Sequence, residues 1–199
     1  MLKKYGFFGC FKLLLFFLRT KLFFNNARLI RFPFDVRNKK NILFGKSFTT
    51  GVGCRIEAYP AKGNLQKIIK FGSNVQINDY VHITAMSSVI IGDNVLMASK
   101  IYISDCSHGF YNGGEIDSSP EQHPIDRSYN ISEVIIEDNV WLGEFVSVLP
   151  GVKIGKGAII GSNSVVTKDI PANTIAVGSP AKVIKKYNFE TKKWEIVKK

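Results

Sequence analysis

The chain has few of the features that identify a disulfide-bonded or zinc-binding protein. Its 199 residues include only three cysteines, Cys10, Cys54 and Cys106, which lie far apart and form no C-x-x-C pair. An odd number of scattered cysteines supports neither a disulfide framework nor a cysteine zinc site. We therefore expect a protein of a reducing compartment, namely the cytoplasm.

Long uncharged stretches are also missing, although the N-terminus is rich in Phe and Leu. The longest charge-free runs there are residues 5–11 and 13–18, whereas a membrane-spanning helix needs about 20 apolar residues. No small-residue cleavage site follows, and basic residues continue to Lys40. We expect neither a spanning helix nor a signal peptide.

Acidic residues are scarce at both ends of the chain. Residues 1–40 hold ten basic side chains and one acidic side chain, Asp35, and residues 181–199 hold seven and two. Residues 41–180 hold ten basic and thirteen acidic side chains, so the formal net charge of +11 comes from the ends. A nucleic-acid-binding protein normally carries its basic patch on a recognisable module. None is present, and we expect no nucleic-acid partner.

The N-terminal segment, residues 1–40, begins with a predicted basic amphipathic helix. On a helical projection Lys4, Lys12 and Arg19 share one side, and Phe and Leu fill much of the remainder. Two interpretations stay open. Residues 1–24 contact the anionic inner membrane peripherally, with cations at lipid phosphates, or the apolar side packs on the folded domain or on a partner subunit.

The dominant pattern is a six-residue repeat. From Phe71 an aliphatic or aromatic anchor recurs at every sixth position, apart from a two-residue slip after Ile83 and a gap before Ile136. The anchors are Phe71, Ile77, Ile83, Ile91, Met97, Ile103, Ile136, Leu142, Val148, Ile154, Ile160 and Val166. Phe44 and Ile56 mark a degenerate first coil in the same register. Strand alternation has period two, so a β-sandwich would not maintain this spacing.

The repeat predicts an all-β fold, a parallel β-helix over residues 41–180. Six residues make one short strand and a corner, so three repeats complete a triangular coil, and coils stack about 4.8 Å apart. Anchors point inward, and stability depends on contacts between neighbouring coils. Residues 109–133 break the pattern as a long excursion, and long loops in compact domains are usually functional. Residues 181–199 are expected to close the stack as a C-terminal helix or tail.

Histidine is also rare, which narrows the choice of a general base. The imidazole pKa of about 6.5 suits proton transfer near neutral pH, and the chain has only His82, His108 and His123. His108 ends a repeat just before the excursion, so we predict that it is the base, with His82 in reserve and His123 solvated. Asp105 is a further candidate, for the substrate or for orienting His108. Cys106 has no basic partner fixed by spacing and is a weak nucleophile candidate.

A hexapeptide-repeat prism with a looped-out segment after a histidine resembles the left-handed β-helix acyltransferases, such as the maltose and galactoside acetyltransferases. More specific strings resemble O-acetyltransferases of lipopolysaccharide O-antigen synthesis: RFPFDVR (31–37), FGKSFTTGVG (44–53), VQINDYVHI (75–83), ASKIYISD (98–105) and SPAKVIKKYN (179–188) with Trp194. The resemblance implies a left-handed coil, acetyl-CoA as co-substrate without a metal, and a sugar or oligosaccharide acceptor. It also implies a homotrimer with active sites between subunits.

The resemblance also implies roles for individual residues. His108 stands where the family has its catalytic histidine, fifteen residues after Asp93, and Asn78 stands where relatives contact the acceptor hydroxyl. Met86 replaces an acceptor-binding aspartate of the sugar acetyltransferases, so their acceptor preference does not transfer. The implied donor-binding set is Trp141, Gly143, Glu144, Ser162, Thr167, Lys168, Lys182 and Lys185, with Trp141 also facing the acceptor.

The function expected from the sequence is direct acetyl transfer from acetyl-CoA to a sugar hydroxyl, with His108 as general base. Three alternatives remain at this point. The same base would serve N-acetylation of an amino sugar. A carbonic-anhydrase-like zinc hydratase of this fold needs three histidine ligands, which is the number present. A scaffold without catalytic activity would use the basic N-terminus for recruitment to a membrane.

Overall fold

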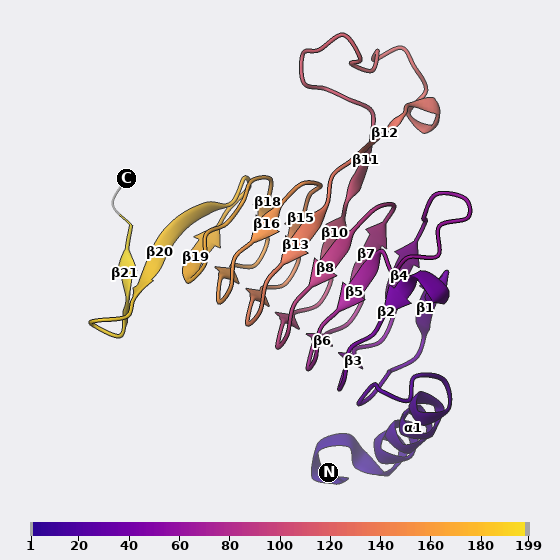
Figure 1. Ribbon diagram of the computed structural model, residues 1–199. Coiled ribbons are helices and arrows are strands. Elements are labelled where there is room, and N and C mark those ends of the chain that lie inside the picture. The colour runs from indigo at the N-terminus through magenta and orange to yellow at the C-terminus, as the bar shows by residue number, and fades with distance from the viewer. Residues whose placement is uncertain (1, 198–199) are drawn as a thin grey trace.

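The structure, a computed structural model, describes residues 2–197. The side chain of Lys4, which the sequence places on the basic side of the N-terminal helix, lies outside the described part, as do residues 1, 198 and 199. Figure 1 shows a stack of coils with a helix at its N-terminal end, a loop that projects from its side, and a hairpin at its C-terminal end.

The coils are built from short strands that visit three sheets in turn. The first face contains β2 (Ile42–Leu43), β5 (Ile69–Phe71), β8 (Val89–Ile91), β13 (Val134–Ile136) and β16 (Lys153–Ile154). The second contains β3 (Thr49–Thr50), β6 (Gln76–Ile77), β9 (Leu96–Met97), β14 (Trp141–Leu142), β17 (Ile159–Ile160) and β19 (Thr174–Val177). The third contains β1 (Phe34–Arg37), β4 (Cys54–Ala58), β7 (His82–Ala85), β10 (Tyr102–Ser104), β15 (Ser147–Val148) and β18 (Val165–Val166).

All pairing between these strands is parallel and in register. For example, Ile83 of β7 lies opposite Ile56 on one side and Ile103 on the other. The chain passes from the first face to the second and then the third before it returns, so each inner coil hydrogen-bonds to the coils on both sides. This is the parallel β-helix that the repeat predicts.

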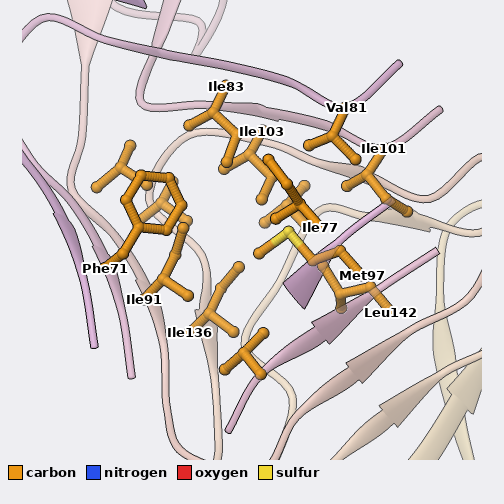
Figure 2. Packing of buried hydrophobic residues seen from close by; sticks show 14 of the residues in the cluster. Phe71, Ile77, Val81, Ile83, Ile91, Met97, Ile101, Ile103, Ile136 and Leu142 are labelled. Carbon is orange, nitrogen blue, oxygen red and sulfur yellow. The ribbon is translucent and has the colours of Figure 1, made fainter. Parts of the chain in front are cut away.

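The predicted anchors form the core, as Figure 2 shows for Phe71, Ile77, Ile83 and their neighbours. All twelve are at most 2% exposed. Ten of the twelve residues four positions further on are buried as well, and the polar one among these ten, Ser164, accepts a hydrogen bond from the Gly178 backbone N–H at 3.0 Å. The two exceptions are Ser87, which is exposed, and Ser107, which is half-buried. In the first coil Ile56 is buried, whereas Phe44 is only half-buried and stacks on Phe71. The prediction of the core from spacing is confirmed.

The predicted boundary at residue 40 is wrong, because the β-helix begins earlier. Strand β1 pairs in parallel with β4 along its whole length, from Phe34 opposite Cys54 to Arg37 opposite Glu57. Ala27 is buried in the same core. Residues 34–37 have no anchor at six-residue spacing, so the repeat does not reveal this strand.

Before this strand lies α1 (Leu2–Phe23), whose backbone is non-helical at Gly6. A short 3-10 helix, η1 (Lys39–Asn41), connects β1 to β2. Within residues 2–197 no helix is both long enough and apolar enough to cross a membrane.

The excursion has an antiparallel base. Strand β11 (Cys106–His108) pairs with β12 (Tyr129–Ile131), and the loop between them contains one turn of 3-10 helix, η2 (Pro124–Asp126). We call β11 and β12 the stalk. The excursion therefore leaves the coil before Cys106, earlier than the predicted residue 109, and projects away from the stack (Figure 1).

The C-terminal residues form a hairpin, and the predicted helix or tail is wrong. Strand β20 (Lys182–Asn188) pairs antiparallel with β19, and β21 (Lys193–Ile196) pairs antiparallel with β20. Tyr187 packs on Trp194 with ring centroids 5.2 Å apart. The hairpin extends the second face and covers the strand edge that the last coil would expose.

Candidate active site

A cleft of about 470 Å³ lies where the excursion leaves the third face. Outward-facing side chains of β7 and β10 form its floor, and the stalk forms one wall. The lining residues are Tyr59, Thr84, Met86, Tyr102, Ser104, Cys106, Ser107, His108 and Tyr129. A cavity of this size is typical of small-molecule sites.

His108 lies in this cleft and is exposed, as a general base requires. It does not end a coil as the sequence suggested, because it is the last residue of β11 and lies opposite Tyr129, whose ring is 4.5 Å away between centroids. The Tyr111 hydroxyl donates a hydrogen bond to the His108 carbonyl at 2.7 Å. Gly109 then turns the chain with φ 91°, and a Cβ there would lie 2.3 Å from the Tyr111 hydroxyl oxygen. The imidazole is thus carried by the stalk.

Asp105 does not fit its predicted role at the substrate. Its side chain is fully buried, and its carboxylate accepts hydrogen bonds from the backbone N–H groups of Met86, Ser87 and Ser88 at 2.7–2.8 Å. A group without exposed surface cannot touch an acceptor. The carboxylate instead holds the corner that carries Met86 into the cleft.

His82 belongs to a polar cluster beside the cleft. Its Nε2 lies 2.8 Å from Glu57 Oε2, and its Nδ1 lies 3.3 Å from an Arg55 guanidinium nitrogen. Glu57 also receives a hydrogen bond from the Tyr59 hydroxyl at 3.0 Å and pairs with Arg37 at 2.6 Å. His82 is therefore held by partners and does not line the cleft.

The charge state of Glu57 follows from these contacts. Burial alone would raise the pKa of this carboxyl, but the hydrogen bonds from His82 and Tyr59 and the charges of Arg55 and Arg37 outweigh it. The pKa lies below its ordinary value, so Glu57 is ionised at neutral pH. Tyr59, at the end of the cleft, is oriented by this carboxylate.

This cluster is not evident from the sequence, because Glu57 and Arg37 occupy alternating strand positions that are usually solvated. The signal lies in the register of the coils. Arg37 lies opposite Glu57, and Glu57 opposite Thr84. Alignment of successive coils would have placed these side chains in one row.

Asn78 lies at a different edge of the prism, in the corner between β6 and β7, where the second face meets the third. Its side-chain oxygen accepts a hydrogen bond from Gln76 Nε2 at 3.2 Å. The left-handed residue of this corner is Tyr80, with φ 57°, so a need for left-handed backbone does not explain the asparagine. Within one chain Asn78 does not line the cleft that holds His108.

The predicted donor-binding residues fall into three groups. The first group lies at the edge between the second and third faces: Trp141 in β14, Gly143 and Glu144 directly after β14, and Ser162 after β17. Thr167 and Lys168 follow β18, at the edge between the third and first faces, which is also the edge where the excursion leaves. Lys182 and Lys185 lie on the C-terminal hairpin, where β20 pairs with β19.

The first of these groups has the chemistry of a site for a long polar ligand. The Trp141 ring is half exposed, although its neighbour Leu142 is fully buried. The Glu144 backbone N–H donates to the Ser162 hydroxyl at 3.2 Å. A Cβ on Gly143 would lie 2.6 Å from the Ser162 backbone nitrogen, so only glycine allows the two corners to stack so closely. The exposed ring and hydroxyl suit a pantetheine arm.

The surroundings of Cys106 and His123 decide whether these two side chains can take part in the chemistry. Burial raises the pKa of the Cys106 thiol above its ordinary value, so this thiol stays protonated at neutral pH and is a poor nucleophile. His123 is exposed and precedes η2 in the excursion. Within residues 2–197 no three His, Cys, Asp or Glu side chains are arranged to hold a metal ion.

Comparisons with known proteins agree with this architecture. A family model for the bacterial transferase hexapeptide (six repeats) matches residues 133–168. The chain is 49% identical over 193 residues to a provisionally named lipopolysaccharide biosynthesis O-acetyl transferase, WbbJ of Escherichia coli strain K12, across 97% of this chain and 96% of that protein.

More distant matches include one curated protein and one solved structure. Galactoside O-acetyltransferase of the same strain is 32% identical over 160 residues, across 80% of this chain and 74% of that protein. The crystal structure of AntD, an N-acyltransferase from Bacillus cereus, superposes with a TM-score of 0.66 at 20% identity, across 82% of this chain and 81% of that chain. With a relative 49% identical along almost its whole length, the chain belongs to the hexapeptide-repeat acetyltransferase family.

Proposed function

We propose that the protein is an O-acetyltransferase that moves the acetyl group of acetyl-CoA to a sugar hydroxyl in lipopolysaccharide O-antigen biosynthesis. The observation that carries the proposal is the exposed imidazole of His108 in a cleft lined by Tyr59, Tyr102 and Tyr129. Aromatic rings and small hydroxyl groups suit a carbohydrate, whose faces are apolar and whose edges are polar. The similarity to WbbJ supports the pathway.

In this mechanism His108 removes the proton of the sugar hydroxyl while the sugar oxygen attacks the acetyl carbonyl carbon. The new ester bond forms as the bond from carbon to sulfur breaks, and His108 returns the proton to the departing thiolate. A backbone N–H stabilises the oxyanion. Because the two substrates react directly, no acyl-enzyme is needed, which agrees with a protonated Cys106. Bringing both substrates together supplies up to about 7–11 kcal/mol.

The placement of the donor-binding residues supports a trimer of left-handed β-helices. Trp141 and Ser162 lie on one edge of the third face, whereas Lys168 and the stalk with His108 lie on the other. A groove between two copies brings one edge from each, so that Asn78 and Trp141 of one subunit face His108 of its neighbour. We therefore propose a homotrimer with threefold symmetry.

We also propose that the enzyme works in the cytoplasm. Cys10, Cys54 and Cys106 are all free thiols, which fits a reducing compartment. The proposed donor, acetyl-CoA, is drawn from the same compartment.

The test is an acetyl-CoA assay against a panel of nucleotide sugars and lipid-linked oligosaccharides, with the product located by NMR. His108→Ala is expected to lower turnover about 10²- to 10⁴-fold, as the loss of a general base does. The matched control is His123→Ala, which removes an exposed histidine from the same excursion. Turnover of H108A equal to that of H123A would reject the assignment. An amide product in place of an ester would establish the N-acetyltransferase alternative.

A further inference from the structure

Helix α1 carries a continuous apolar stripe on its solvent side. Eight large side chains of the helix are each at least 50% exposed: Phe7, Phe8, Phe11, Leu14, Leu15, Leu18, Leu22 and, at its last residue, Phe23. At about 3.6 residues per turn, positions 7, 11, 14, 18 and 22 lie along one line of the helix surface, and positions 8 and 15 lie beside it. An apolar surface of this extent on a protein usually marks an interaction site.

The opposite side of the helix is already bound to the β-helix. Thr20 is fully buried, and its hydroxyl accepts a hydrogen bond from the Ile30 backbone N–H at 2.8 Å. The Phe16 ring packs on Phe32 with centroids 6.0 Å apart. These contacts fix the rotation of the helix about its axis. Packing on the chain's own domain therefore uses Phe16 and Thr20 and leaves the stripe outside.

Cations border the stripe. Lys12 and Arg19 follow one side of it, and Lys21 follows the other. Asp35 is the only acidic residue in the first 56 positions, and it pairs with Arg37 at 3.3 Å. The surface around α1 is thus strongly positive as well as apolar. It lies at the N-terminal end of the stack, well separated from the excursion (Figure 1).

We propose that this stripe is a docking surface for the anionic face of a lipid bilayer. The helix lies in the plane of the headgroups, its Phe and Leu side chains enter the boundary with the acyl chains, and its cations meet lipid phosphates. The charge of the region favours an anionic bilayer as the partner, because an apolar stripe flanked by cations is complementary to an apolar layer beneath anionic headgroups. The proposal does not depend on acetyl transfer.

The experiment is co-sedimentation of the purified full-length protein with phosphatidylcholine vesicles that either contain or lack phosphatidylglycerol. The test variant, Phe11→Glu with Leu18→Glu, puts two carboxylates in the stripe. The matched control is Phe189→Glu with Ile196→Glu, which makes the same charge change at two exposed residues of the C-terminal hairpin. Circular dichroism and size-exclusion chromatography with light scattering establish that each variant folds and how it assembles.

The wild-type protein and the hairpin variant are expected to sediment with vesicles that contain phosphatidylglycerol and to be released in part by salt. The stripe variant should bind at least about 100-fold more weakly, since each buried Phe or Leu contributes about tenfold. Lys12→Gln with Arg19→Gln should weaken binding about 25-fold, at about fivefold per charge.

Two outcomes would overturn the proposal: the wild-type protein stays in the supernatant with vesicles that contain phosphatidylglycerol, or the stripe variant binds as the wild type does. If wild-type binding is absent and the stripe variant also changes the oligomeric state, the stripe is an interface between subunits. His108→Ala should bind vesicles normally, so a failed catalytic proposal is distinguishable from a failed docking proposal.

Discussion

Asp105 is expected to hold the cleft together without touching the substrate, and Asp105→Asn tests this. The carboxylate is fully buried and accepts three backbone hydrogen bonds from the corner of residues 86–88. One oxygen accepts the hydrogen bond from Met86, and the other accepts those from Ser87 and Ser88. An amide keeps one accepting oxygen and turns its NH₂ group toward at least one of these N–H donors. The variant thus loses the charge and one or two of the three bonds.

The cost follows from the contacts. A hydrogen bond to a charged group contributes about 1.5–3 kcal/mol, and a neutral one about 0.5–1.5 kcal/mol. One lost bond and two bonds weakened from charged to neutral sum to about 3.5–6 kcal/mol. Ser87 is exposed, so water can reach part of the corner and reduce the loss. We expect D105N to lower the free energy of unfolding by about 2–4 kcal/mol.

The assay is urea unfolding followed by circular dichroism, at the same protein concentration for each variant because assembly affects apparent stability. Asp93→Asn is the matched control, since the exposed Asp93 accepts one backbone hydrogen bond, from Ser73 at 2.6 Å. Its loss should be below about 1 kcal/mol. Hydrogen exchange at residues 86–88 should accelerate in D105N. Equal unfolding midpoints for D105N and D93N, or a raised KM for D105N with unchanged stability, would refute the reasoning.

Two further predictions concern Glu57 of the third face and Cys106 of the stalk. Glu57→Gln should destabilise the protein by about 1–3 kcal/mol at neutral pH. Because the folded-state pKa of Glu57 is below its ordinary value, this contribution is complete above about pH 4.3 and is lost as the pH falls through the folded pKa. In urea titrations, a difference between the two proteins that stays constant as the pH falls below about 4.3 and through the folded pKa would contradict this. Cys106→Ser should keep turnover near the wild-type value and should not change the pH profile of kcat/KM, whereas loss of activity on the scale of H108A would implicate the thiol in catalysis.

The core was predictable from the sequence because one physical requirement, a side chain pointing into a narrow prism, repeats at every sixth residue. The parts that escaped prediction obey other rules. The stalk consists of two antiparallel strands of three residues each, and strands this short show no periodic pattern in the sequence. In the first strand of the C-terminal hairpin every second side chain is half-buried, at Val183, Lys185 and Tyr187. The many lysines of the segment hide this alternation, because a lysine-rich sequence is also typical of a solvated helix or tail.

The candidate site was predictable in its chemistry and less so in its surroundings. Histidine is rare in this chain, so the choice of His108 needed only its place before the excursion. Its neighbours Tyr59 and Tyr129 come from segments 49 residues before and 21 residues after it, and only the closed coil and the stalk bring them together. The carboxylate of Glu57 resembles a surface residue until the register places Arg37 opposite it on one side and β7, the strand that carries His82, on the other.

The excursion interrupts the hydrogen bonding between coils, and the Asp105 carboxylate supplies replacement acceptors. In an uninterrupted stack each coil supplies backbone carbonyls to the one before it, as Ala85 does for the Tyr59 N–H at 2.7 Å. After Ser104 the chain leaves for the excursion, so the N–H groups at the corner of residues 86–88 lose the carbonyls that a next corner would offer. The carboxylate of Asp105 accepts all three at the point of departure. A coil can thus release a long segment that carries His108 without leaving the donors of this corner unpaired. The stability of the stack and the shape of the cleft depend on the same side chain.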